Sequence, residues 1–320
     1  MLNTKMRTES DTKSGMAGRK ILICTTFREF NGNSNDKIQR LFLSTLKRQT
    51  YQNYLVVATT FGEKNVESAL REEKVPHVIF AGDAGEYRFS STQVMENGIS
   101  LIDKSKSYII IWTTCDDLLE DRFFERIVNT MTPFSCCTSL PHIVYRNIED
   151  YKKKKIGGRI YGGIDLICFD GDVFLNSEAR SAIRDYPNKG WGLFEYFLSG
   201  IGRVFCQRMY NAWPAQIEAI RNDRKANNET LSYFDSSTTY NKKKYVDFIR
   251  KYSLKGDVYS SILCYKTSFR YVKVWSMIFI MVTIYRIQGA FFKSRLFRSI
   301  SPGVKKIFRK IIGKRINDHA

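Results

Sequence analysis

Two adjacent carboxylates, Asp116 and Asp117, directly follow a strongly hydrophobic run at 108–112. Such a run predicts a buried strand, so the two acids would stand just past its carboxyl end. Ligands of open α/β sheets bind at that edge. Paired carboxylates there suit a divalent cation that neutralises a departing diphosphate. The same aspartates could instead cap a following helix, expected over 119–131, and the spacing alone leaves both interpretations open.

The segments around this pair alternate between expected strands and helices. Short apolar runs predict strands at 21–24, 55–58, 78–80, 108–112 and 164–169. Amphipathic spacing predicts helices at 38–46, 66–73 and 91–102. From about residue 213 the chain has the pattern of polar helices. Short connections between alternating elements predict an α/β, Rossmann-like, mostly parallel sheet flanked by helices on both faces.

Composition limits the class of protein. The 320 residues are 43% hydrophobic and 14% aromatic, which excludes disorder of the whole chain and suffices for one large domain with an appendage. The seven cysteines form no CxxC pair and lie largely in apolar runs, which favours reduced, buried thiols in a cytosolic protein. Residues 1–19 are polar without an apolar core, so we expect a disordered tail rather than a signal peptide.

The positive charge gathers at the C-terminal end. The formal net charge is +19, and residues 266–320 hold 13 lysines and arginines against the single acid Asp318. Apolar residues recur there at helical spacing with basic residues between them, at Val304, Ile307, Phe308, Ile311 and Ile312. This predicts a basic amphipathic helix lying on an anionic membrane surface, where each basic residue contributes about 1 kcal/mol. A nucleic-acid partner is not expected, because its arm would not need the apolar stripe.

An uncharged run at 274–285 precedes that helix. Twelve helical residues cover about 18 Å, short of the ~30 Å hydrocarbon core, and extending the run to residue 292 would place Arg286 and Gln288 inside. We favour an in-plane or re-entrant segment over a span, with a buried core helix or a dimer interface as the alternative. The expected location is the cytoplasmic face of a membrane, with peripheral or monotopic attachment.

Five stretches between residues 20 and 205 resemble, in order, the family 2 glycosyltransferases of the GT-A fold. The closest is Ser44-Thr45-Leu46 followed by Gln49-Thr50-Tyr51-Gln52-Asn53-Tyr54, which is similar to a segment of that family with the pattern Q-T-Y-x-N. The others are Ile21 to Phe27, Asn97-Gly98-Ile99, Asp116-Asp117 with Asp121-Arg122-Phe123, and Gly190-Trp191-Gly192-Leu193-Phe194-Glu195.

The resemblance implies an organisation and a set of site residues. A GT-A-like catalytic domain would span 20–215, with a donor-binding half at 20–117 and an acceptor half at 118–215. A helical extension at 216–265 and the membrane-associating segment at 266–320 would follow. The implied metal ligands are Asp116 and Asp117, for Mn²⁺ or Mg²⁺, and Trp191 and Gly192 would face the acceptor. The implied donor-binding residues are Thr25, Thr26, Phe27, Arg28, Thr59, Thr60, Arg88, Asn97 and Asp116.

The sequence departs from the family pattern in three places. The turn after the first strand carries Arg28 and Glu29 where a small polar residue is more usual. The aspartate that usually follows the second strand and contacts the nucleobase is replaced within 58–61, where Thr59, Thr60 or nearby Glu63 could substitute for it. The first aspartate of the acidic motif corresponds to Thr114. A metal would therefore be held by fewer carboxylates than is usual in the family.

The resemblance implies a single inverting displacement, in which an acceptor hydroxyl attacks the anomeric carbon as the nucleoside diphosphate leaves. A carboxylate must take the hydroxyl proton, and Glu195 is our first candidate, with Asp165 and Asp170 as alternatives. Burial beside aromatic residues would raise the pKa of Glu195. Glu195 could instead cap a helix whose aromatic residues only pack. Arg88 is a candidate for contact with the diphosphate, whereas the lysines at 152–155 fit a solvated face or a membrane contact better.

The sequence therefore predicts a nucleotide-sugar-dependent glycosyltransferase acting on a lipid-linked or cell-surface glycan acceptor, of the polysaccharide, O-antigen or lipopolysaccharide type. One alternative is a nucleotidyl- or phosphotransferase on the same half-fold. The loop at 25–29 counts against it, because such enzymes usually carry a glycine-rich phosphate loop there. The other alternative is a non-catalytic, basic membrane- or nucleic-acid-binding protein, in which Asp116, Asp117 and Glu195 would have no role.

Overall fold

The computed structural model describes residues 18–83, 90–139, 142–145, 147–153, 160–161, 166–187, 194–212, 217–220 and 242–254. They all belong to one compact unit, Met1–Lys266. The tail expected at 1–19 lies outside the described residues up to residue 17. Arg19 itself, the last residue assigned to that tail, is buried in the domain.

A seven-stranded sheet forms the centre of the described domain. Its strands stand in the order β10-β6-β9-β4-β1-β2-β3. All neighbouring pairs are parallel except those of β9, which runs antiparallel to β4 and to β6. The predicted mostly parallel, Rossmann-like and GT-A-like α/β sheet is therefore confirmed. The strands are β1 (Lys20–Thr25), β2 (Tyr54–Thr60), β3 (His77–Ala81), β4 (Tyr108–Trp112), β6 (Ser135–Ser139), β9 (Ile167–Asp170) and β10 (Arg208–Ala212).

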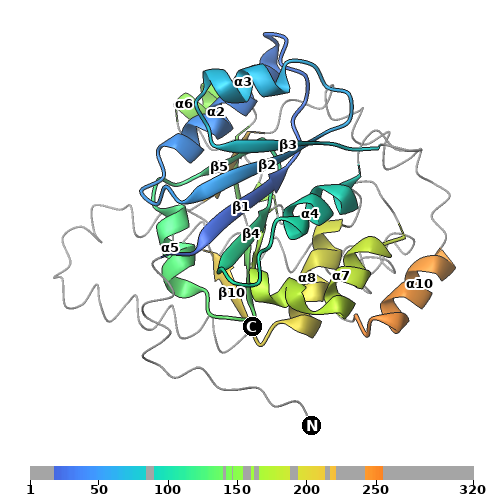
Figure 1. Ribbon diagram of the computed structural model, residues 1–320. Coiled ribbons are helices and arrows are strands. Elements are labelled where there is room, and N and C mark those ends of the chain that lie inside the picture. Colours follow the sequence, from blue (N-terminus) through green and yellow to red (C-terminus); the bar gives the residue numbers. More distant parts are fainter. Residues whose placement is uncertain are drawn as a thin grey trace. The chain divides into compact units, whose positions relative to one another are not determined.

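Helices cover both faces of this sheet (Figure 1). On one face lie α2 (Ser34–Lys47), α3 (Val66–Glu72) and α5 (Phe123–Thr130); on the other lie α4 (Ser91–Ser100), α7 (Ser177–Arg184) and α8 (Phe194–Phe205). Alternation along β1 explains the two layers, since Ile21 and Ile23 join the first core cluster while Leu22 and Cys24 join the second. All four side chains are at most 1% exposed.

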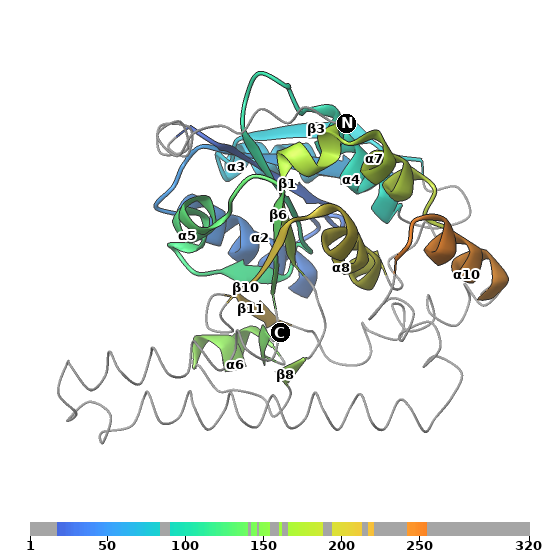
Figure 2. The same ribbon diagram turned by 90° about the horizontal axis from the view of Figure 1, so that it is seen from below.

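A second sheet corrects two of our predictions. Its strands, in the order β5-β11-β7-β8, are β5 (Asp117–Leu119), β11 (Ile217–Ile220), β7 (His142–Tyr145) and β8 (Ile160–Tyr161). The helix predicted from residue 119 begins only with α5, because the preceding residues pair with β11. The chain after residue 213 is likewise not helical throughout, since β11 lies within it. Figure 2 shows β11 and β8 beside the short helix α6 (Ile148–Lys152).

The order of connections creates a reversal point beside β1. From β1 the chain passes through α2 to β2 and through α3 to β3, always in one direction across the sheet. It then returns through α4 to β4, on the other side of β1. Ligands of open α/β sheets bind outside the carboxyl ends of the strands where the direction reverses. The loops after β1 and β4 therefore form the expected binding edge.

The segment that carries the closest family resemblance has a structural role. Gln49 is 2% exposed, and its amide donates to the carbonyls of Thr45 and Glu120 at 3.1 and 2.8 Å and accepts from the Phe124 N–H at 2.9 Å. Tyr51 donates its hydroxyl proton to the Arg19 carbonyl. This motif thus joins the end of α2 to the start of α5 and to the start of β1.

A buried ion pair closes the amino-terminal edge of the sheet. Arg19 and Asp170 are both 3% exposed at the side chain and contact each other directly. The other Asp170 oxygen accepts from the N–H groups of Phe134 at 2.9 Å and Asp172 at 3.2 Å. Burial raises the pKa of Asp170 to about 6, although Arg19 and these N–H groups lower it. The free energy lost when this carboxylate is removed from water therefore exceeds the free energy gained from its ion pair and hydrogen bonds.

The membrane-associating segment predicted at 266–320, with its amphipathic helix and the uncharged run at 274–285, lies outside the described residues. Among the helices within them, none combines the length and the hydropathy needed to cross a bilayer. Of the helical extension predicted at 216–265, the structure describes β11 and one helix, α10 (Lys242–Lys251).

Replacement of Gln49 by Met should destabilise the domain. The substitution removes the acceptor of the buried Phe124 N–H, and an unsatisfied buried group of this kind costs about 1–3 kcal/mol. Urea unfolding followed by circular dichroism measures the effect. The exposed Gln207 provides a control, because Gln207→Met should change the free energy of unfolding by less than about 0.5 kcal/mol. Equal losses for the two variants would contradict the structural role of Gln49.

The protonated Asp170 carboxyl should stabilise the folded state at low pH, and this contribution to the free energy of unfolding should disappear as the pH rises. Its folded pKa lies above its ordinary value of 3.8, so the folded state retains a proton that the unfolded chain releases. The contribution is fully present below about pH 4 and disappears through pH 6, with a size of up to about 3 kcal/mol. The difference in unfolding free energy between the native protein and Asp170→Asn should therefore fall from pH 4 to pH 7. A difference that grows with pH would mean that Arg19 dominates and lowers the pKa.

Candidate functional site

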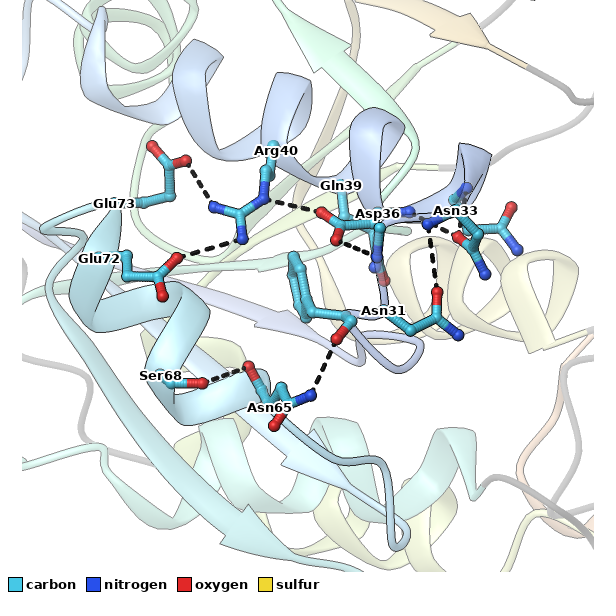
Figure 3. Close-up of polar contacts among 12 residues, drawn as sticks. Asn31, Asn33, Asp36, Gln39, Arg40, Asn65, Ser68, Glu72 and Glu73 are labelled. Atoms are coloured by element: carbon cyan, nitrogen blue, oxygen red, sulfur yellow. Dashed lines mark hydrogen bonds and ion pairs between the residues drawn. The ribbon is translucent and has the colours of Figure 1, made fainter.

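The loop after β1 is held from two sides. The Phe30 N–H donates to the Lys64 carbonyl at 3.4 Å, and its carbonyl accepts from the Asn65 side chain at 3.0 Å. The Gly32 N–H donates to Asp36 at 2.8 Å, with Gly32 in the left-handed region at φ 78°. Figure 3 shows Asn65 and Arg40 beside this loop; the Arg40 guanidinium pairs with Asp36, Glu72 and Glu73. The loop is therefore fixed against both α2 and the start of α3.

Gln39 fixes the centre of the same loop. The side chain is 2% exposed; its oxygen accepts from the Arg28 N–H at 2.5 Å, and its amide nitrogen donates to the Arg28 carbonyl at 3.2 Å. The oxygen also accepts from the Cys115 thiol at 3.4 Å. One buried amide thus contacts the loops that follow β1 and β4.

Arg28 brings a positive charge to this edge. The side chain is partly exposed, and within the part of the chain that the structure describes its guanidinium forms no ion pair. Burial raises the pKa of the Cys115 thiol to about 12; Asp116 raises it too, while Arg28 acts in the opposite direction. Arg28 and Cys115, the residue before Asp116, therefore share one hydrogen-bond partner, the Gln39 oxygen.

The loop after β4 is closed by Asp117. One carboxylate oxygen accepts from the Thr113 hydroxyl at 3.0 Å, the Thr114 N–H at 3.2 Å and the Thr114 hydroxyl at 2.9 Å. Asp117 is fully buried. It starts β5 and caps no helix, so the helix-cap alternative is wrong. The three hydrogen bonds to one carboxylate oxygen hold the loop in shape, and a metal-binding role for Asp117 stays a prediction.

Asp116 is left as the partly exposed carboxylate of this loop. A divalent cation fits such a site only in part. The described residues contain no group of three histidine, cysteine, aspartate or glutamate side chains that could hold one. Magnesium, however, is often bound through one or two carboxylates together with substrate phosphates. Asp116 is the residue that would hold the cation, with the remaining ligands supplied by a bound diphosphate.

Four of the predicted donor-binding residues are committed to packing. Phe27 is fully buried, with its ring 5.9 Å from that of Phe30 and 6.2 Å from that of Phe42. Thr25 and Thr59 are fully buried as well, and Asn97 donates its amide to the Thr59 hydroxyl at 2.8 Å. In the structure the side chains of Thr25 and Phe27 belong to the core, and Asn97 with Thr59 joins α4 to β2; contact of these residues with a donor stays a prediction.

Gly98, next to Asn97, allows α4 to approach β1 closely. A Cβ atom at this position would lie 2.1 Å from the Cys24 sulfur, which no side chain tolerates. The family-like Asn97-Gly98 stretch therefore serves the contact between helix and sheet.

Two predicted donor-binding threonines remain at the binding edge. Thr26 is 5% exposed, and its hydroxyl oxygen has no hydrogen-bond partner among the residues that the structure describes. Thr60 is partly exposed and donates to the Phe80 carbonyl at 3.4 Å. Glu63, the possible substitute for the missing aspartate, accepts from the Phe61 N–H at 2.6 Å. Since Glu63 closes the turn after β2, a hydroxyl rather than a carboxylate is available beside that strand.

An aromatic cluster sets the place of Glu195. Glu195 is the second residue of α8. Its neighbour Phe194 packs against Trp112, the last residue of β4, with ring centroids 5.6 Å apart. Tyr186 stacks on Phe197 of α8 at 4.5 Å, and Phe248 of α10 lies 5.3 Å from Phe197. The backbone of Glu195 thus starts its helix beside the end of β4, at the binding edge.

The alternative general base Asp170 lies at the opposite edge. In the antiparallel pair of β4 and β9, Ile167 is opposite Trp112 whereas Asp170 is opposite Ile109. Three residues of strand separate Asp170 from the binding edge by about 10 Å, and its charge is paired with Arg19. Asp170 is therefore a structural residue, which corrects its assignment. Asp165, Arg88, Trp191 and Gly192 lie outside the described residues.

Our sequence analysis did not identify Gln39, although its pattern held a signal. Phe42, Leu43 and Leu46 lie three, four and seven residues after it, so Gln39 occupies the apolar stripe of the helix. A polar side chain within such a stripe must find buried partners. The pattern indicates a buried amide, but not which loops it contacts.

Replacement of Asp117 by Ala should destabilise the protein, whereas replacement of Asp116 by Ala should leave its stability nearly unchanged. Asp117→Ala leaves three donors without their acceptor and should destabilise the protein by at least about 1.5–3 kcal/mol, the range for one hydrogen bond to a charged group. Asp116→Ala should change stability by less than about 1 kcal/mol. Urea unfolding of both variants tests the assignment. A larger loss of stability in Asp116→Ala would contradict it.

Comparison with known proteins finds structures of similar fold but no related sequence. No protein-family model matches the chain, and no curated protein sequence matches it. Solved structures that it resembles include 4-diphosphocytidyl-2C-methyl-D-erythritol synthase from Anaerococcus prevotii, at 11% identity and a TM-score of 0.40, over 69% of this chain and 99% of that one.

Two further solved structures are also similar. Glucosyl-3-phosphoglycerate synthase from Mycobacterium tuberculosis, in complex with Mg²⁺ and uridine diphosphate, has 10% identity and a TM-score of 0.41, over 70% of this chain and 80% of that chain. Mouse xyloside xylosyltransferase 1 has 12% identity and a TM-score of 0.32, over 51% and 70%. Likeness at this level does not distinguish one transfer reaction from another.

Proposed function

We propose that this protein is a nucleotide-sugar-dependent glycosyltransferase. The observation that carries the proposal is the meeting of two loops at the reversal point of the sheet. The loop after β1 supplies Arg28, and the loop after β4 supplies Asp116; the buried Gln39 side chain hydrogen-bonds both loops, at Arg28 and at Cys115. A cation and a single partly exposed carboxylate at the carboxyl ends of parallel strands suit a diphosphate bound with a divalent metal.

Arg28 would stabilise the leaving group. As the glycosidic bond to the diphosphate breaks, negative charge grows on the departing oxygen. A guanidinium that is fixed in advance stabilises this charge without rearrangement during the reaction. The two hydrogen bonds between Gln39 and the Arg28 backbone supply that fixation.

A metal would contribute in the same place. Bound through Asp116 and the diphosphate oxygens, Mn²⁺ or Mg²⁺ would supply Lewis acidity toward the leaving phosphate. Asp116 would hold the cation, while Asp117 keeps the loop in shape through Thr113 and Thr114.

Glu195 is our candidate for the general base of an inverting displacement. Its place at the start of α8, next to Phe194 and the end of β4, puts its backbone at the binding edge. A carboxylate there would take the proton of the attacking acceptor hydroxyl. Asp170 does not compete for this role, since it lies at the far edge of the sheet.

We further propose an acceptor that is lipid-linked or part of a cell-surface glycan, with the protein attached to the cytoplasmic face of a membrane. The support is the basic block at 266–320, whose apolar residues recur at helical spacing. Attachment to an anionic surface would place the catalytic domain near an acceptor whose lipid tail lies in the bilayer.

A thermal-shift screen with UDP-, GDP-, dTDP- and CMP-sugars, each with Mn²⁺, Mg²⁺ or chelator, tests the proposal. One donor should stabilise the protein by about 2.7 kcal/mol at 100 times its dissociation constant. In Asp116→Ala the metal-dependent part of the shift should vanish. With that donor, Arg28→Met should lower turnover by about 10²- to 10³-fold, while its unfolding free energy stays near the native value.

The products distinguish the competing functions. A glycosyltransferase releases a nucleoside diphosphate or monophosphate from the sugar nucleotide, whereas a nucleotidyltransferase releases pyrophosphate from a nucleoside triphosphate. Pyrophosphate release dependent on Arg28 would replace the proposed reaction by nucleotidyl transfer. Absence of any nucleotide effect in a folded sample would favour the non-catalytic membrane-binding alternative.

A further inference from the structure

We propose that Gln39, together with the Cys115 thiol, sets the spacing between Arg28 and Asp116 and thereby the affinity for the nucleoside diphosphate. In this role both are positioning residues that act through the two loops rather than by touching the ligand. The inference rests on the proposed function of the site but adds residues that the family resemblance did not indicate.

The first support is the pairing of Gln39 with the loop after β1. Its amide satisfies both the N–H and the carbonyl of one residue, Arg28, at 2.5 and 3.2 Å. Two hydrogen bonds to one residue fix the orientation of its backbone as well as its position. The direction in which the Arg28 side chain leaves the loop is therefore set by a buried group of α2.

The second support is the contact with the loop after β4. The Cys115 thiol donates to the same Gln39 oxygen at 3.4 Å, and Asp116 is the next residue. The Gln39 oxygen therefore receives one donor from each loop, and a shift of either loop would weaken one of the two contacts.

The same helix offers a matched comparison. Gln49 follows α2 closely and is equally buried at 2% exposure. Its amide also joins separate segments, through the Glu120 carbonyl and the Phe124 N–H. Neither of those segments contains Arg28 or Asp116. Gln49→Met thus removes a buried bridging amide of the same kind without touching the proposed positioning contacts.

The test combines hydrogen exchange with nucleotide binding in full-length Gln39→Met, Gln49→Met and the native protein. Mass spectrometry would report amide exchange in residues 26–31 and 113–117. Calorimetry would report binding of UDP, GDP, dTDP or CMP with Mg²⁺. In Gln39→Met we expect faster exchange in both loops and a dissociation constant raised about 10- to 100-fold, as for other residues that orient a ligand-binding group. In Gln49→Met we expect neither change.

A pair of Cys115 variants refines the test. Cys115→Ser keeps a hydroxyl donor for the Gln39 oxygen and should bind the nucleotide like the native protein. Cys115→Ala removes the donor and should weaken binding in the same direction as Gln39→Met. Unequal effects of Ser and Ala separate a hydrogen-bonding role from simple packing, since both side chains are smaller than cysteine.

The outcomes separate this inference from the proposed function. If the native protein binds none of the four nucleotides, the proposed function fails, and the exchange data alone decide whether Gln39 couples the loops. If Gln39→Met shows native exchange in either loop, the coupling is overturned. Native nucleotide affinity in Gln39→Met, or an equal loss of affinity in Gln49→Met, would overturn the positioning role.

Discussion

The structure depends on the enclosure of β1. This strand is hydrogen-bonded to β2 on one side and to β4 on the other, and its residues from Ile21 to Cys24 are at most 1% exposed. The central residues of the strand are thus paired on both sides and buried on both faces. Whatever follows β1 and β4 must emerge at one edge of the sheet, side by side. The candidate site is a consequence of this enclosure.

Enclosure also explains which residues the sequence could reveal. A strand buried on both faces must be apolar throughout, so the runs that became β1 and β4 were predicted from hydrophobicity alone. The carboxylates after β4 could be located because they end such a run. What each carboxylate does could not be predicted. Asp116 and Asp117 are adjacent and chemically identical in the sequence, yet the turn buries one and leaves the other partly exposed.

The less regular elements could not be predicted from the local sequence pattern, because their partners lie far away along the chain. The three residues of β5 pair with β11, which follows about 100 residues later, and no local pattern records that partner. Asp170 illustrates the same limit, because its partner Arg19 is 151 positions away. The family resemblance identified the correct fold, but it assigned to ligand contact several residues, such as Phe27 and Asn97, that hold helices and loops in place.

Gln39 on α2 and Gln49 just after it suggest how one segment serves both stability and function. Each is a polar side chain buried to 2% exposure, so each costs desolvation unless it is fully hydrogen-bonded. Gln49 hydrogen-bonds segments that carry no candidate ligand-binding group, so only the stability of the fold depends on these bonds. Gln39 hydrogen-bonds the two loops at the reversal point, which carry Arg28 and Asp116. A buried amide at that position constrains the geometry of charged groups that the sheet alone would leave to two independent loops.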